Sequence, residues 1–249
     1  MKLLKVALLG LNALIVACST TNDNNNYIQP DEVVVERSTK ERAQTLADLG
    51  LAYYQLEKYT YALEYLKESL ALDTHNAQTY QVIGLINMRQ NLPEQAQISF
   101  TKALHVEPDN FDILTDYAVF LYGQERYAEA LSTFKRIVKA PFYKRKWVAY
   151  TYLGLYDLKN GQKREAEKKF YYALKINENY APALLEMAKI RYSKGEMMAA
   201  RAFIERYFSN AGKTLEGLRL AIKVEQALQD DDMVEQYQLE LKHAYPYAD

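Results

Sequence analysis

The sequence predicts an all-α protein, a right-handed superhelix of about six helix–turn–helix units. The first observation is a period: Ala62, Ala96, Ala130, Ala166 and Ala200 are separated by 34, 34, 36 and 34 residues. The second is that each of these alanines has a small residue twelve positions before it and a large apolar residue four positions after it. The small residues are Gly50, Gly84, Ala118, Gly154 and Ala188, and the large ones are Leu66, Phe100, Phe134, Phe170 and Ile204. Small residues where two helices cross let the backbones approach, and the repeated pattern indicates stacked helix pairs.

This period is typical of tetratricopeptide repeats. Five clear repeats are expected at 43–76, 77–110, 111–146, 147–180 and 181–214, with a degraded sixth at 215–249 that suits a terminal cap, and together they form a repeat domain over 43–249. Asn160-Gly161 and Lys194-Gly195 mark turns inside repeats four and five. The two extra residues of repeat three predict a longer loop near Pro141.

Residues 1–17 are predicted to be a lipoprotein signal peptide. Lys2 and Lys5 precede and interrupt a mostly apolar stretch that is shorter than the roughly 20 residues needed to span a bilayer. The stretch ends at Ala17-Cys18, which resembles a bacterial lipobox. The resemblance implies cleavage before Cys18 and acyl chains on its thiol and amine, which would hold the chain on a membrane. A signal peptide without lipidation, followed by an incidental cysteine, is the alternative.

Residues 18–42 are predicted to contain the lipidated cysteine and a flexible tether. The stretch from Ser19 to Asn26 is polar and has nothing to bury. Val33-Val34-Val35 is interpreted as part of this solvated linker, with a short strand or a docking segment as the alternative. Ser19 follows the cysteine, and a residue other than Asp at this position usually implies export to the outer membrane in double-membrane bacteria.

No pattern of catalytic, metal-binding or cofactor-binding residues is visible in the sequence. His75, His105 and His243 have no ligand partners at a suitable spacing, and Cys18 is the only cysteine. There is no glycine-rich phosphate loop. The formal net charge of −1 gives no reason to expect a nucleic acid as partner. We therefore expect a protein that is not an enzyme and that needs no metal or cofactor.

Recognition of another protein is the chemistry that the repeats predict. Positions one and four after the small residue of each first helix are expected to face the inside of the superhelix, and nine of these ten positions are apolar or aromatic. A long apolar strip usually marks a partner site, although ordinary core packing is the alternative for any one residue. The predicted groove consists of Leu51, Tyr54, Leu85, Met88, Val119, Tyr122, Leu155, Leu158 and Tyr192.

The chain as a whole resembles the type IV pilus biogenesis and stability lipoprotein, the pilotin of the pilus secretin. The resemblance rests on the lipobox, the tether, the six repeats, and the stretches 116–130, 185–188, 217–221 and 241–246. It implies a lipid-anchored protein on the periplasmic face of the outer membrane. Such a protein binds the secretin, brings it to the outer membrane and promotes its multimerisation.

Three other readings remain open at this point. The chain could scaffold cell-wall hydrolases, or it could belong to the machinery that assembles outer-membrane proteins. The even spacing of the repeats counts against the assembly machinery. The third reading is an enzyme of an unrecognised type, and the lack of a convergent set of titratable residues argues against it.

Overall fold

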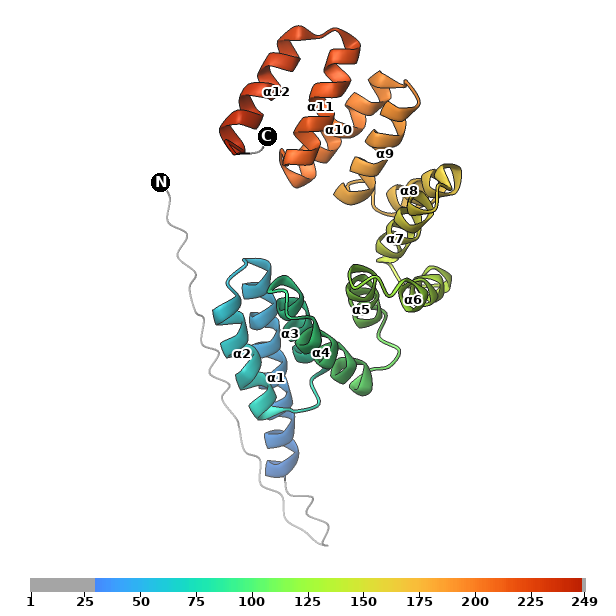
Figure 1. Cartoon of the computed structure of the whole chain (residues 1–249). Coiled ribbons are helices and arrows are strands. Elements are labelled where there is room, and N and C mark those ends of the chain that lie inside the picture. The colour runs from blue at the N-terminus through green and yellow to red at the C-terminus, as the bar shows by residue number, and fades with distance from the viewer. Residues whose placement is uncertain (1–29, 248–249) are drawn as a thin grey trace, which may run out of the picture. The chain divides into compact units, whose positions relative to one another are not determined.

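The computed structural model describes residues 30–247, with side chains from Ser38 onward, and all of its regular structure is helical (Figure 1). Within this range twelve helices follow one another in six pairs, which confirms the predicted all-helical repeat architecture. The first helices of the pairs are α1 (Pro30–Gln55), α3 (Ala77–Arg89), α5 (Phe111–Gly123), α7 (Lys146–Lys159), α9 (Ala181–Ser193) and α11 (Leu215–Leu228). The second helices are α2 (Tyr59–Leu72), α4 (Pro93–Val106), α6 (Tyr127–Lys139), α8 (Lys163–Ile176), α10 (Met197–Ala211) and α12 (Asp231–Ala244).

The predicted signal peptide and Cys18 lie outside the described residues. The predicted tether differs from the structure in part, because residues 30–42, including Val33-Val34-Val35, belong to helix α1. Pro30 is the first residue of α1 and acidic Asp31 and Glu32 follow it, a pattern that favours a helix start. Extending a helix that already exists costs far less than nucleating one, which favours one continuous helix over Pro30–Gln55. Contacts divide the chain after Ser38, and the features described below belong to the unit Thr39–Asp249.

The packing of each pair depends on the small residue of its first helix. A Cβ atom built on Gly84 would lie 3.0 Å from the ring of Phe100, and one on Gly154 would lie 2.8 Å from the ring of Phe170. The alanine of each second helix, from Ala62 to Ala200, is completely buried. Phe100 also contacts Phe120 of the next repeat, with ring centroids 5.7 Å apart. The periodic residues therefore join the two helices of a pair and each pair to the next.

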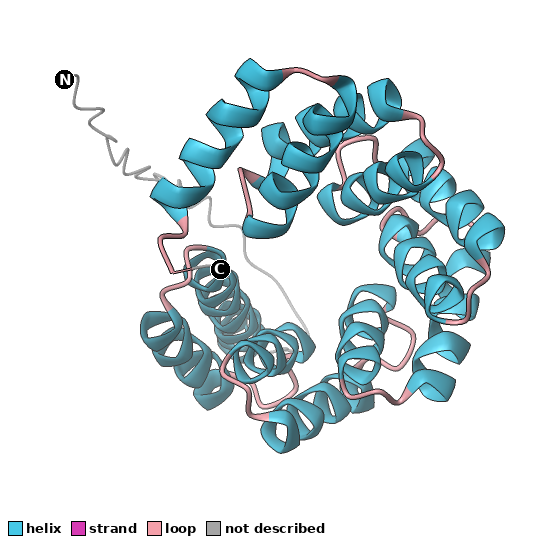
Figure 2. Ribbon diagram, turned by 45° about the horizontal axis from the view of Figure 1, so that its top comes forward, coloured by secondary structure: helices cyan, strands magenta, loops and turns pink. Residues whose placement is uncertain are grey.

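The first helices form the inner layer of the array. α3 contacts α5, α5 contacts α7 and α9 contacts α11, whereas each second helix mainly contacts the first helices before and after it. Because the first helices lie closer together than the second ones, the array curves toward them. Figure 2 shows the helix pairs following this curved path.

The turn inside each of the five clear repeats has the same backbone conformation at the same repeat position. The residue seven positions after each small residue has a left-handed backbone in all five repeats. These residues are Glu57, Asn91, Glu125, Gly161 and Gly195, with φ between 57° and 77°. Glycine adopts this conformation without steric cost, whereas a residue with a Cβ atom is strained there.

The connections between repeats differ more than the turns within them. Residues 73–76, 107–110 and 177–180 each join one pair to the next with four residues, and 140–145 uses six. The longer loop predicted near Pro141 is therefore confirmed. At the end of the array Tyr237 is the one fully buried residue of α12, which fits a terminal unit that faces water.

Candidate partner-binding groove

The nine side chains predicted to form the groove all lie on first helices, and every one of them is half-buried. Each packs against a cluster of fully buried residues with part of its surface and leaves the rest exposed. These side chains therefore form the inner edge of the core, and the exposed part of each remains accessible to a partner. Their contact with a partner stays a prediction.

Three of the nine side chains come together in one large hollow. Leu51, Tyr54 and Leu85 line a cavity of about 960 Å³ on the first helices of repeats one to three. Met88, Val119 and Tyr122 pack instead against the buried cluster that contains Phe100 and Phe134. Leu155 and Leu158 pack against the cluster around Phe170, and Tyr192 packs against the cluster of the last two repeats. We call the cavity and its lining residues the inner groove.

Polar side chains from neighbouring repeats are linked across the inner groove. The Nε2 atom of Gln44 on α1 donates to Oε1 of Gln78 on α3 at 2.8 Å and to Oδ1 of Asp48 at 3.0 Å. The Nε2 atom of Gln78 donates to the same Asp48 oxygen at 2.8 Å. Gln44 and Gln78 are 34 residues apart, so they occupy the same position of successive repeats.

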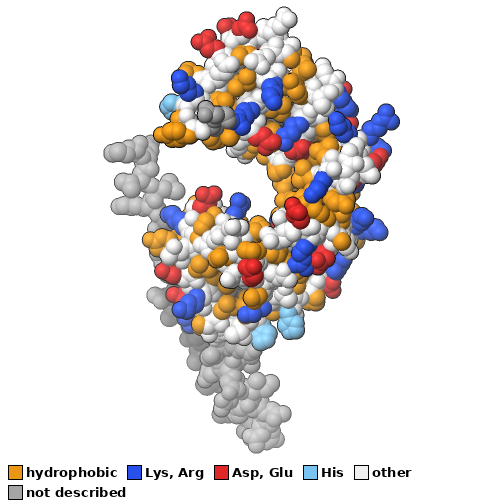
Figure 3. Space-filling view, in the orientation of Figure 1, with side chains coloured by type: hydrophobic (Ala, Val, Ile, Leu, Met, Phe, Trp, Pro, Cys, Tyr) orange, Lys and Arg blue, Asp and Glu red, His pale blue; other side chains and the backbone are white. Residues whose placement is uncertain are grey.

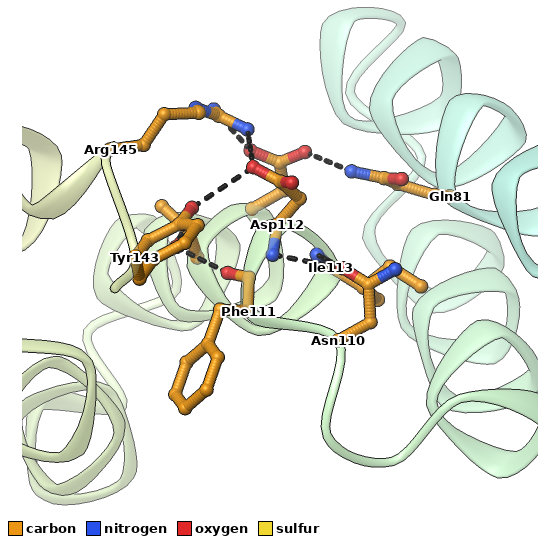
Figure 4. Close-up of polar contacts among 9 residues, drawn as sticks. Gln81, Asn110, Phe111, Asp112, Ile113, Tyr143 and Arg145 are labelled. Atoms are coloured by element: carbon orange, nitrogen blue, oxygen red, sulfur yellow. Dashed lines mark hydrogen bonds and ion pairs between the residues drawn. The ribbon is translucent and has the colours of Figure 1, made fainter. Parts of the chain in front are cut away.

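Arg145, at the end of the six-residue loop, closes the groove on the side of repeat three (Figure 4). Its guanidinium group forms ion pairs with Asp112 at 2.8 Å and with Asp116 at 3.2 Å. The hydroxyl group of Tyr143 donates to Asp112 at 3.0 Å, and Nε2 of Gln81 donates to the second oxygen of Asp116 at 2.6 Å. Three elements, α3, α5 and the loop, therefore share one polar cluster.

Helix α5 presents these two carboxylates because of how it begins. The side-chain oxygen of Asn110 accepts from the backbone N–H groups of Asp112, at 2.9 Å, and Ile113, at 3.3 Å, which makes Asn110 an N-cap. Asp112 then lies in the first turn, where a negative charge is favoured, and Asp116 follows one turn later. Both side chains point to the same side of the helix.

Burial and the neighbouring charges both shift the pKa values of the groups in this cluster. Burial raises the pKa of the Asp116 carboxyl above its usual value, although Arg145 and Gln81 act in the opposite direction. Burial also acts to lower the pKa of Arg145, but the Asp116 and Asp112 carboxylates outweigh it and raise that pKa. The ion pair is therefore held in a partly desolvated place, where breaking one side is costly.

The inner groove is acidic as a whole. Five carboxylates line it, those of Glu41, Asp73, Glu107, Asp112 and Asp116, whereas Lys40 and Arg145 are its two cations. With its apolar floor of Leu51, Tyr54 and Leu85, this rim suits a partner segment that carries both apolar and basic side chains. Complementary charge of this kind steers the encounter and sets the register of the bound segment.

Beyond the groove, the inner layer continues as a cluster of tyrosines. The ring of Tyr122 meets those of Tyr127 and Tyr152 edge to face, with centroids 5.1 and 5.0 Å apart, and Tyr127 contacts Tyr156 at 5.6 Å. Burial raises the pKa of Tyr122 to about 12, so its hydroxyl group stays protonated at neutral pH. Tyr122 is thus an element of a packed aromatic cluster as well as a predicted groove residue.

The sequence interpretation missed the polar half of the groove. It considered only the apolar phases, one and four positions after the small residue. Gln44, Gln78 and Asp112 stand six positions before the small residues, again 34 residues apart, and this regular spacing was the available signal. Arg145 carried no such signal, because it lies in the loop that departs from the period.

Within residues 30–247, no group of three or more His, Cys, Asp or Glu residues is arranged to hold a metal ion. Among the helices of the described part of the chain, none is both long and apolar enough to cross a bilayer.

Comparison with known proteins finds similarity to tetratricopeptide repeats and, over nearly the full length of the chain, to type IV pilus assembly proteins. Family models of the tetratricopeptide repeat match residues 43–76 and 83–143. The type IV pilus assembly protein PilF of Pseudomonas aeruginosa is 27% identical over 243 residues, which are 97% of this chain and 94% of PilF.

Solved structures give the same result. The structure of Pseudomonas aeruginosa PilF superimposes with a TM-score of 0.72 at 27% identity and covers 85% of this chain and 95% of that one. The crystal structure of PilW, a widely conserved type IV pilus biogenesis factor, gives a TM-score of 0.67 at 25% identity and covers 83% and 95% of the two chains.

Proposed function

Since the chain is a tetratricopeptide-repeat protein homologous over nearly its full length to the type IV pilus assembly proteins PilF and PilW, we propose that it is a pilotin. In this role it is a scaffold without enzymatic activity. It binds the secretin of the pilus machine, brings it to the outer membrane and promotes its multimerisation.

The observation that carries this proposal is the extent of the homology. The match to PilF covers 97% of this chain and 94% of PilF, so it includes all six repeats and not one generic repeat alone. An isolated match to tetratricopeptide repeats would support only protein binding of some kind. The agreement over the full array supports the same assembly pathway.

The inner groove supports the binding step. A partner segment that covers Leu51, Tyr54 and Leu85 removes apolar area from water, at about 25 cal/mol per Å². Basic side chains of the same segment would meet the carboxylates of the rim. We propose that the secretin segment bound here is amphipathic and carries lysine or arginine.

The anchoring step rests on the sequence around Cys18. We propose that Cys18 carries the acyl chains that hold the protein on the periplasmic face of the outer membrane. Two or more acyl chains anchor a protein stably, whereas a single chain binds a membrane only marginally. A Cys18→Ser variant is expected to leave the outer-membrane fraction while its repeats keep their helical circular dichroism spectrum. Retention of all of the variant in the outer membrane would contradict a lipid anchor at Cys18.

The binding step is tested by Leu85→Glu, with Ile98→Glu as its matched control. Leu85 lies on α3 in the inner groove, and Ile98 lies on α4 with 56% of its surface exposed. A carboxylate on the apolar floor would lose its hydration where the secretin segment covers it, and this cost opposes binding. We expect Leu85→Glu to abolish co-purification of secretin and pilus assembly, and Ile98→Glu to preserve both.

The outcome is interpretable because folding is measured alongside binding. Circular dichroism must show that Leu85→Glu is as helical as the control. A folded variant that still captures secretin would rule out the groove as its binding site. Capture of cell-wall hydrolases or of outer-membrane assembly proteins by the unmodified chain, without secretin, would overturn the proposed function itself.

A further inference from the structure

The outer face of repeat four differs from that of every other clear repeat. Five and six positions after the buried alanine, the second helices of the other repeats carry charged or polar pairs. These are Lys67-Glu68, Thr101-Lys102, Lys135-Arg136 and Glu205-Arg206. Repeat four carries Tyr171-Tyr172, with 58% and 49% of their surfaces exposed. Packing within the array does not require aromatic rings at these outward positions.

This tyrosine pair is continuous with the start of α7. The ring of Tyr172 contacts that of Tyr171 at 6.0 Å and that of Tyr150 on α7 at 5.6 Å between centroids. Tyr150 lies four residues after Lys146, on the same side of α7, and Lys146 directly follows the six-residue loop 140–145. The exposed rings of α8 thus continue through α7 to this loop.

The loop holds one aromatic ring out into solvent. Phe142 has 94% of its surface exposed, whereas Ala140 before it is buried. Tyr143 after it packs on Phe111, with centroids 5.5 Å apart, and its hydroxyl group contacts Thr115 at 2.9 Å. The ion pairs of Arg145 fix the other end of the loop. The projection of Phe142 is therefore built into the fold.

The same surface carries an excess of positive charge. Lys135, Lys139, Lys144, Arg164 and Lys175 form no side-chain hydrogen bond or ion pair within the part of the chain that the structure describes. Figure 3 shows lysine and arginine side chains along the edge where α6 and α8 lie in Figure 1. The corresponding loops 73–76, 107–110 and 177–180 are acidic instead, with Asp73, Glu107, Asp109 and Glu178.

We propose that this surface binds anionic phospholipid headgroups and lays the outer face of repeats three and four on a bilayer. We call it the basic–aromatic face and define it by Lys135, Lys139, Phe142, Lys144, Tyr171 and Tyr172. Aromatic rings gather at the membrane–water interface, and lysines near the surface are attracted by anionic lipids. Neither feature suffices alone, and their combination is the composition of a peripheral membrane surface.

A hollow beside the tyrosine pair fits the same ligand. Between α8 and α9 lies a cavity of about 460 Å³ lined by Tyr171 and Tyr172 and by four basic residues, Arg164, Lys168, Arg191 and Lys194. Glu167 pairs with Arg191 and Lys194, and Lys168 pairs with Glu165 at 2.7 Å, which leaves Arg164 as the lining cation without an ion pair in the described part of the chain, for a headgroup phosphate.

Bilayer contact at this face leaves the inner groove accessible. The basic–aromatic face lies on the second helices α6 and α8 and on the loop 140–145, whereas the groove is lined by first helices and by the loops that precede them. The two regions meet at the loop 140–145, where Arg145 lines the groove and Phe142 is exposed. The proposal does not depend on the identity of the partner in the groove. It adds an orientation to a chain that an anchor alone would leave free to turn.

The test measures partitioning of the full chain with Cys18→Ser, which cannot be acylated, onto vesicles of phosphatidylethanolamine with or without phosphatidylglycerol. The variant Lys135→Gln/Lys139→Gln/Lys144→Gln is compared with Lys67→Gln/Lys223→Gln/Lys242→Gln, which removes equal charge from exposed lysines elsewhere. Residues 1–17 are common to both chains, so their contribution cancels. We expect about a hundredfold weaker binding to the anionic vesicles for the first triple variant only, at about fivefold per lysine.

A second measurement locates the contact. Phe142→Trp should be quenched by brominated phosphatidylglycerol, and Phe142→Ser should weaken binding about tenfold through lost apolar burial. Equal binding of the two triple variants, or an unquenched Trp at position 142, would overturn the proposal. So would loss of a protein partner from the first triple variant with its binding to anionic vesicles unchanged, because the face would then serve an acidic protein.

Discussion

The inner groove of repeats one to three and the basic–aromatic face of repeats three and four are built on the same kinds of buried residue at the same repeat positions. Both rest on a small residue of a first helix, an alanine of a second helix and a large apolar side chain between them. They differ at the exposed repeat positions, which packing does not constrain. These positions carry acidic and amide side chains in the groove and cationic and aromatic side chains on the outer face. The comparison teaches that the periodic buried residues determine the scaffold, whereas the exposed residues, which vary between repeats, determine the chemistry of each surface.

The largest effect on stability is expected at the helix crossings, which support both regions. Gly84→Leu and Gly154→Leu place side chains against the rings of Phe100 and Phe170, at Cβ distances of 3.0 and 2.8 Å. Overpacking costs about 1–3 kcal/mol, and separating the two helices adds to that cost, so each variant should lose about 3 kcal/mol of unfolding free energy. Thermal and urea melts measure this loss.

Gly123→Leu is the matched control, because a Cβ atom at Gly123 meets nothing within 4 Å. Its stability should stay within about 1 kcal/mol of the unmodified chain. Equal stability of all three variants would show that the small residues are not the helix-crossing positions.

The next largest effect on stability is expected at Arg145, which lies in the loop between the two regions. Arg145→Ala leaves the carboxylates of Asp112 and the largely buried Asp116 without their cation. Breaking a buried pair costs about 3–5 kcal/mol, and the partial exposure of this one reduces the expected loss at neutral pH to about 2 kcal/mol. Urea melts of the variant measure it, and the loop that presents Phe142 should become susceptible to proteolysis.

The pH dependence of this loss identifies its cause. The pKa of Asp116 is raised by burial already in the unmodified chain, and loss of Arg145 should raise it further. For a carboxyl with a raised folded-state pKa, the contribution to stability is present below the unfolded pKa and is lost as pH rises through the folded one. The deficit of Arg145→Ala should therefore shrink as pH falls below the pKa of Asp116 in the folded variant. A deficit that is constant with pH would point to lost packing alone.

The fold was largely predictable from the sequence, whereas the two surfaces were only partly so. Gly84, Phe100 and Ala96 recur at fixed phases because one steric arrangement is repeated, and that made the repeat boundaries predictable. The start of α1 at Pro30 was missed because residues 30–42 lie outside the period and have no packing signature. Gln44 and Gln78 were missed because a single polar residue is ordinarily solvated, and their mutual hydrogen bond depends on the stacking of two repeats.

A smaller effect tests whether charge matters in the groove. Glu41 lines its rim and is exposed, so Glu41→Lys should leave the fold unchanged. If the secretin segment is basic, the variant should bind it about fivefold more weakly at low salt, and the difference should fade as screening increases. Glu205→Lys, on the outer helix α10, makes the same charge change away from the groove. Equal, salt-independent effects of both substitutions would contradict charge recognition in the groove.

The smallest effect concerns the turns that all repeats share, and it also separates backbone strain from surface chemistry. Glu125 has a left-handed backbone with φ of 57°, at the position where Gly161 and Gly195 have φ of 75° and 77°. The left-handed conformation costs a residue with a Cβ atom about 1–2 kcal/mol, and the extra freedom of an unfolded glycine offsets part of the relief. Glu125→Gly should therefore raise the unfolding free energy by about 0.5–1 kcal/mol, whereas Gly195→Ala should lower it by a similar amount. Urea melts of the two variants, with binding to secretin and to anionic vesicles measured in parallel, provide the check. Because neither Glu125 nor Gly195 lines the inner groove or belongs to the residues that define the basic–aromatic face, both binding activities should stay unchanged while stability moves in opposite directions. A decrease in stability for Glu125→Gly would mean that the glutamate side chain stabilises the turn by more than its backbone strain costs.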